Sequence, residues 1–116
     1  PTLLACALAL LVATPLGAQD AAPTTRTFTV VARDGRFEPE RIDVTRNDLV
    51  RITLTAAETP ASFAIDAYRL MKRAGAGESV TFASRADQVG RFAYYCSLSS
   101  NDQCRTMKGT LVVAER

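Results

Sequence analysis

From residue 27 onward, the chain alternates between apolar and polar residues. The clearest runs are 27–33, 41–45 and 49–55, in which every second residue is apolar. Such alternation predicts half-buried β-strands, which turn one face toward a core and the other toward solvent. A turn-forming pair, Asp34–Gly35, follows the first run.

The second half of the chain continues the pattern in shorter runs. Strands are predicted over 61–66, 78–84, 92–95 and 110–114, whereas 67–73 is compatible with either one or two helical turns or an extended connection. About seven short strands without a long helix are typical of an all-β, antiparallel β-sandwich. The predicted core consists of Phe28, Phe37, Ile42, Val44, Val50, Ile52, Leu54, Phe63, Ile65, Val80, Phe82, Phe92, Tyr94, Leu111 and Val113.

The first 18 residues have a different character, because they carry no charge and are apolar from Leu3 to Val12. This composition is typical of the apolar core and cleavage region of a secretory signal peptide. We therefore expect a signal segment over 1–18, a flexible lead-in over 19–26, and one domain over 27–116 in the periplasm or outside the cell. Two alternatives, lipidation of Cys6 or an uncleaved anchor, would hold the N-terminus at the membrane.

Composition narrows the chemistry that this chain can perform. The sequence contains no His, so it lacks the imidazole that many catalytic bases, nucleophile pairs and metal sites require. Its net charge is +2, which does not favour nucleic acid or an anionic membrane as a partner. We therefore expect a protein that is not an enzyme.

The candidate chemistry lies between the last two predicted strands. Cys96, Cys104 and Met107 fall within one polar stretch there. Two thiolates and a thioether are soft ligands that suit Cu(I), while paired cysteines in an exported protein also form disulfides. The residues by themselves leave both interpretations open.

Several segments of the chain keep a characteristic order and spacing. They are Phe37–Pro39, Ile42–Val44, Asp48–Ile52, Phe63–Ile65, Gly90–Cys96 and Met107–Val113. In this arrangement the chain resembles the cupredoxins, and most closely the branch with the copper-A domain of cytochrome c oxidase subunit II and nitrous-oxide reductase. The resemblance covers residues 27–114 and implies a Greek-key β-sandwich.

The resemblance also places the family's copper ligands on this sequence. Cys96 and Met107 match the family's cysteine and methionine, whereas Ala61 and Cys104 stand where the family has histidines, and Ser100 stands where copper-A has its second cysteine. A blue-copper site needs two His and a thiolate with a weak axial Met. The resemblance therefore implies the fold, but neither family copper centre, and we expect no resident cofactor.

Because the family's side chains at positions 96 and 104 reach one copper, the resemblance implies that the two sulfurs of this chain lie close together. We expect a structural disulfide between Cys96 and Cys104, in a binding or interaction module with an envelope protein as partner. One alternative is a copper-handling protein that binds Cu(I) through Cys96, Cys104 and Met107. Others are a reversible redox pair, and an electron-transfer protein that borrows ligands from a partner.

The remaining candidate residues receive structural interpretations. Met71 is expected in the core or at its rim, and one face of the Tyr94–Tyr95 pair is expected to pack inside. A solvated surface position is expected for the acidic residues Asp34, Glu38, Glu40, Asp43 and Asp48.

Overall fold

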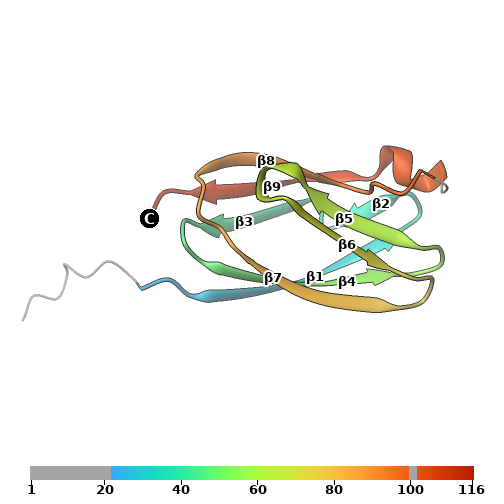
Figure 1. Ribbon diagram of the computed structural model, residues 1–116, viewed down its shortest axis with the longest axis horizontal. Helices are drawn as coiled ribbons and strands as arrows, with labels where there is room; N and C mark the ends of the chain where they lie inside the picture. The colour runs from blue at the N-terminus through green and yellow to red at the C-terminus, as the bar shows by residue number, and fades with distance from the viewer. Residues whose placement is uncertain (1–21, 100–101) are drawn as a thin grey trace, which may run out of the picture.

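The structure, a computed structural model, describes residues 22–99 and 102–116 and consists of two β-sheets packed face to face (Figure 1). The first sheet has the order β2-β1-β4-β7 and the second has the order β3-β9-β8-β5-β6. The first sheet is formed by β1 (Thr25–Arg33), β2 (Arg36–Glu38), β4 (Leu49–Ala56) and β7 (Ser79–Arg85). The second is formed by β3 (Arg41–Thr45), β5 (Ala61–Ile65), β6 (Leu70–Ala74), β8 (Gly90–Tyr95) and β9 (Lys108–Ala114).

The predicted β-sandwich is confirmed, with nine strands in the described part of the chain instead of about seven. Two strand pairs, β1 with β4 and β3 with β9, run parallel, so the sheets are mixed and not wholly antiparallel. The chain crosses to the second sheet as β3 before it returns as β4, and this crossover permits the parallel pairing. The register sets Phe28 beside Ile52 and Val30 beside Leu54, so inward residues stay adjacent.

The ambiguous stretch 67–73 contains both of the alternatives that its pattern allowed. A short 3-10 turn, η2 (Asp66–Tyr68), takes over the predicted end of the preceding strand at Asp66, and β6 then pairs antiparallel with β5. Arg69 joins the two in a left-handed conformation with φ 51°. Another 3-10 turn, η3 (Asp102–Thr106), lies between β8 and β9.

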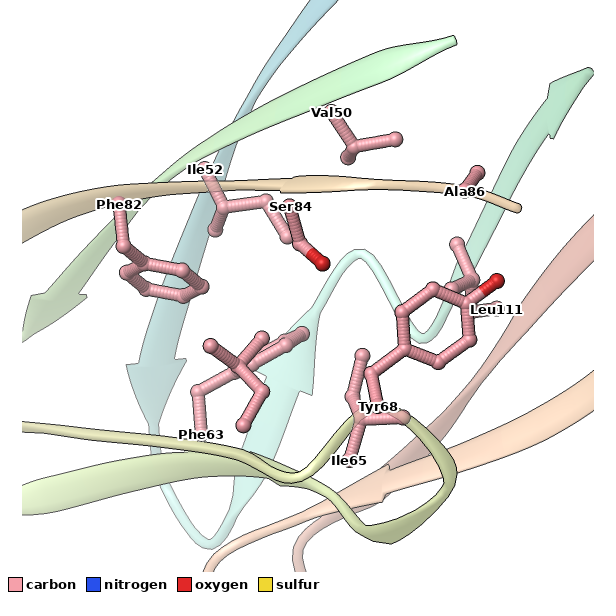
Figure 2. Close-up of a pocket in the computed structure, with 10 residues that line it drawn as sticks. Val50, Ile52, Phe63, Ile65, Tyr68, Phe82, Ser84, Ala86 and Leu111 are labelled. Carbon is pink, nitrogen blue, oxygen red and sulfur yellow. The ribbon is translucent and has the colours of Figure 1, made fainter. Parts of the chain in front are cut away.

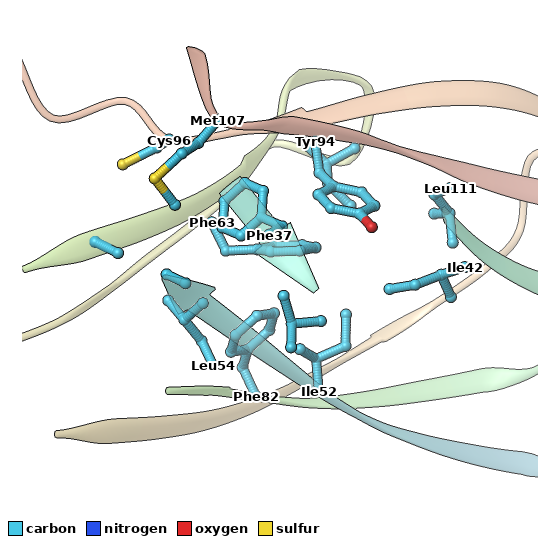
Figure 3. Packing of buried hydrophobic residues seen from close by; sticks show 14 of the residues in the cluster. Phe37, Ile42, Ile52, Leu54, Phe63, Phe82, Tyr94, Cys96, Met107 and Leu111 are labelled. Atoms are coloured by element: carbon cyan, nitrogen blue, oxygen red, sulfur yellow. The ribbon is translucent and has the colours of Figure 1, made fainter. Parts of the chain in front are cut away.

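The core is built around a cluster of aromatic rings (Figure 3). The rings of Phe63 and Tyr94 stack with centroids 4.7 Å apart, and Phe37 meets both of them edge-on. Tyr94 donates a hydrogen bond to the carbonyl oxygen of Pro39 at 2.8 Å. Gly109 lies directly against this ring, and a Cβ there would collide with it. Most of the predicted core is confirmed as buried, while Phe28, Val80 and Phe92 are half-buried at its margin.

Tyr68 closes one open side of the sandwich, where its ring faces the apolar gap between the sheets (Figure 2). Its hydroxyl donates a hydrogen bond to the backbone carbonyl oxygen of Gln88 at 3.2 Å and accepts one from the backbone N–H of Gln88 at 3.3 Å. Partial burial is the main cause that raises the pKa of Tyr68 above its usual value. The ring thus packs against the margin of the core, where it meets the ring of Phe92 edge-on.

Asp48 was wrongly predicted at the solvated surface, because it is only 1% exposed. Its carboxylate accepts from the backbone N–H of Thr24 and Thr45 and from the Arg116 guanidinium. Burial acts to raise the pKa of Asp48, but the hydrogen bonds from Thr45, Thr24 and Arg116 outweigh it and hold that pKa below its usual value. Asp48 therefore joins the start of β1 to the C-terminal end of the chain.

The structure also bears on the predictions for Met71 and for the start of the domain. Met71 lies on β6 with 55% of its surface exposed, so it is not a core residue. Strand β1 begins at Thr25, within the stretch predicted as a lead-in, because it already pairs with Leu49 there. The signal segment, Cys6 and Ser100 lie outside the described residues. Among those residues, no helix has the length and apolarity needed to cross a bilayer.

Candidate functional site

The sequence-predicted sulfur residues come together at one end of the core, and we call Cys96, Cys104 and Met107 the sulfur site. Cys96 directly follows β8, Cys104 lies in η3, and Met107 immediately precedes β9. Their exposed fractions are 7%, 2% and 4%, so all three side chains are buried. Figure 3 shows Cys96 and Met107 at the same end of the core cluster.

Cys96 and Cys104 are joined by a disulfide, with the sulfurs 2.03 Å apart and the Cα atoms 5.0 Å apart. Backbone hydrogen bonds reinforce this arrangement. The Cys96 N–H donates to the Met107 carbonyl oxygen at 3.2 Å, and the Met107 N–H donates to the Cys104 carbonyl oxygen at 3.2 Å. The loop between β8 and β9 is therefore closed by the disulfide and by the main-chain bond from Cys96 to Met107, while the bond from Met107 to Cys104 tightens its last turn.

Ser62, on the neighbouring strand β5, connects the sulfur site to the rest of its sheet. Its backbone N–H lies 3.3 Å from Cys96 Sγ and its hydroxyl lies 3.8 Å from the same atom. The hydroxyl also accepts a hydrogen bond from the Ser97 N–H at 2.7 Å. Ser62 is fully buried although alternation assigns it to the outer face of the strand, so the sequence pattern carried no signal for this role.

The residues present do not fit the copper centres of the family. Ala61, which the resemblance matches to a histidine of the family, is 1% exposed and belongs to the apolar core, where it offers no ligand atom. Cys96 and Cys104 are bonded to each other, and the sequence contains no His. Within 22–99 and 102–116, no three His, Cys, Asp or Glu side chains gather as metal ligands would. Met107 keeps the thioether that the resemblance matches to the methionine ligand of the family.

Polar and charged groups near the sulfur site lie on β8 and on η3. Tyr94 lies in the core, and its burial, together with the charge of Glu40, raises its pKa above its usual value. η3 carries an exposed ion pair between Arg105 and Asp102 at 3.7 Å. Thr106 donates from its hydroxyl to the Gly35 carbonyl oxygen at 3.2 Å, which joins η3 to the turn after β1.

Comparison with solved structures gives the same fold. The TM-score is 0.65 with auracyanin A, a "blue" copper protein from Chloroflexus aurantiacus, at 16% identity over 77% of this chain and 98% of that one. It is 0.64 with the metal-binding domain of the Cu(I)-exporting P-type ATPase CopA of Streptococcus pneumoniae, at 19% identity over 78% of this chain and 87% of that one.

A heme-copper terminal oxidase shares the fold with a TM-score of 0.66 and 16% identity over 76% of this chain, which spans 64% of the oxidase chain. At these identities the likeness shows the fold alone. No curated protein matches the chain. The sequence does match the family described as "Cupredoxin-like domain", over residues 3–113. The chain therefore belongs to the cupredoxin-like domain family.

Proposed function

We propose that this protein is an exported, non-enzymatic interaction module in which a disulfide has replaced copper as the cross-link at the sulfur site. The observation that carries the proposal is the bond between Cys96 and Cys104, which joins two positions where the family has copper ligands. In the copper proteins a metal would hold the end of β8 against the following loop. Here the covalent bond does so, and it uses the thiolate that a blue-copper centre requires.

The substitutions support a fold kept without its electron-transfer chemistry. Ala61 packs in the core and Cys104 is oxidised, so both imidazole positions are lost. Cys96 and Met107 remain at positions that match the copper-A branch, and we take this as the ancestry of the chain. A small β-sandwich without its metal gains stability from a cross-link, and an oxidising compartment outside the cytoplasm maintains that bond.

The test is a thiol and copper assay on the full chain, purified without reductant. We expect no free thiol at Cys96 or Cys104 by alkylation and mass spectrometry. After incubation with Cu(II) and desalting, we expect no bound copper and no visible copper–thiolate absorption band. Copper retained with such a band in the native protein would overturn the proposal.

A second candidate function is Cu(I) binding by the reduced sulfur site, and the position of Met107 favours it. Met107 is buried beside Cys96, and its backbone bonds to both cysteines hold it there. A dithiol reductant would break the S–S bond, supply two electrons and two protons, and itself become a disulfide. The product would be two thiols next to a thioether, a soft donor set that suits Cu(I).

Titration of the reduced protein with Cu(I) against a competing chelator tests this second function. Cys104→Ser is expected to abolish binding and Met107→Leu to weaken it. Met71→Leu is the matched control, since that thioether lies on the exposed strand β6. Equal affinity in Met107→Leu and Met71→Leu, or no binding at all, would exclude the sulfur site as a Cu(I) ligand set.

A further inference from the structure

The outer face of the second sheet carries a hollow of about 260 Å³ next to the sulfur site. Its lining residues come from β5, η2, β6 and the end of β8. They are Ala64, Ile65, Asp66, Arg69, Leu70, Met71, Tyr95 and Ser97. We call this feature the outer hollow.

Strand pairing explains why the surface is hollowed here. Ala64 pairs with Met71 on one side and with Tyr95 on the other, so these side chains form one row across three strands. Because Ala64 is small, it forms a low floor between a thioether and an aromatic ring. Met71 is 55% exposed, which is unusual for a large apolar side chain and gives the outer hollow an apolar wall open to solvent.

Asp66 and Arg69 are the two charged residues that line the outer hollow, and two further cations lie on the same face of the sheet. Arg69 lines it, Arg73 lies on β6 on the same face as Met71, and Lys108 pairs with Tyr95. In the part of the chain that the structure describes, none of these three cations takes part in an ion pair. The carboxylate of Asp66 is engaged instead by the hydroxyl of Tyr95 at 2.7 Å.

The position of Arg69 is itself costly for the backbone. Its φ of 51° is one that residues other than glycine adopt rarely, at a cost of about 1 kcal/mol or more. Strain of this kind gathers at binding sites, where the surrounding structure maintains it. Arg69 in this conformation places its guanidinium, a group that pairs well with carboxylates, at the edge of the apolar hollow.

We infer that the outer hollow is the docking site for an acidic segment of a partner protein, which inserts one apolar side chain between Met71 and Tyr95 while its carboxylates meet Arg69. This inference rests on the proposed interaction function and names the chemistry of the partner. Charge complementarity selects an acidic segment, and the concave apolar floor selects an inserted side chain. A flat anionic membrane would use the cations but not the hollow.

The probe for this inference is a capped peptide with one Leu between pairs of Asp, titrated into the ¹⁵N-labelled full chain and followed by NMR. We expect amide shifts to concentrate at Ala64, Arg69, Tyr95 and Ser97. Arg69→Gln keeps the backbone conformation and removes the charge, and should weaken binding about tenfold. Arg51→Gln, on the outer face of the opposite sheet, makes the same change of charge and should leave the affinity unchanged.

Two matched peptides separate the components of the interaction. Replacing Asp by Asn, or the central Leu by Gly, should each weaken binding by about tenfold. Equal losses in Arg69→Gln and Arg51→Gln, shifts that lie elsewhere, or displacement of the peptide by anionic phospholipid vesicles would overturn the docking site. If the peptide does not bind, while the protein is copper-free and its disulfide is intact, the docking inference alone is wrong. Copper retention would instead overturn the proposed function.

Discussion

Reduction of the Cys96–Cys104 bond is expected to lower the free energy of unfolding by about 2.5 kcal/mol. The bond joins residues eight positions apart in the sequence. Loop-closure entropy for a ring of about that length gives this value at 25 °C, because reduction frees the unfolded chain to adopt more conformations. For a domain of this size, the change corresponds to a fall of roughly 1–2 M in the urea midpoint.

The assay compares oxidised and reduced protein in urea, followed by tyrosine fluorescence and far-ultraviolet circular dichroism. Both cysteine residues are at least nine-tenths buried, so the protein is best reduced in its unfolded state and then refolded with dithiothreitol present. Cys6→Ala in every sample removes the third cysteine of the sequence as a rival for pairing.

An unchanged midpoint after reduction would refute the idea that the disulfide stabilises this fold in place of a metal. Addition of Cu(I) to the reduced sample, after anaerobic removal of dithiothreitol because a dithiol itself binds Cu(I), distinguishes the two candidate functions. If Cu(I) restores the midpoint by binding the folded state, the reduced sulfur site is a metal site. If the midpoint stays low, the cross-link alone holds the loop.

Three further predictions concern buried contacts. Asp48→Asn should lower the unfolding free energy by about 2 kcal/mol at neutral pH in urea melts, whereas Asn at the exposed Asp43 should change it little. Because the pKa of Asp48 is held low in the folded state, the stability that Asp48 contributes is complete above its unfolded pKa and is lost as pH falls through its folded pKa. Asp48→Asn should therefore flatten the acid limb of the curve of unfolding free energy against pH, and an unchanged limb would contradict this. Ser62→Ala should cost about 1 kcal/mol in urea, because the part-buried hydrogen bond from the Ser97 N–H to the buried Ser62 hydroxyl is lost; no loss would argue against that bond. Gly109→Ala should lower the melting temperature and weaken the near-ultraviolet tyrosine signal, since the new methyl group overlaps the Tyr94 ring; an unaltered signal would mean that the ring can move aside.

The strands that could be predicted from sequence are those in which apolar and polar residues alternate over several repeats. Strands β1, β3 and β4 follow the pattern because each repeats it over at least five residues. β2 has only three residues and β6 lies in a segment without clear alternation, so neither had a local signal. Asp48 was misplaced because a carboxylate beside an Asn in a turn usually faces water, and its partners Thr24 and Arg116 are distant in sequence.

The sequence by itself determined the period of the strands, most of the apolar core, the absence of imidazole, and the presence of two cysteines and a methionine near the last strand. These are local or compositional properties, which require no knowledge of chain pairing. Only the tertiary structure decided that β1 and β4 run parallel, that Ser62 is buried against Cys96, and that Met71, Ala64 and Tyr95 form one row. Each of these depends on register between strands far apart in the chain, and register is set by the packing of the whole sandwich.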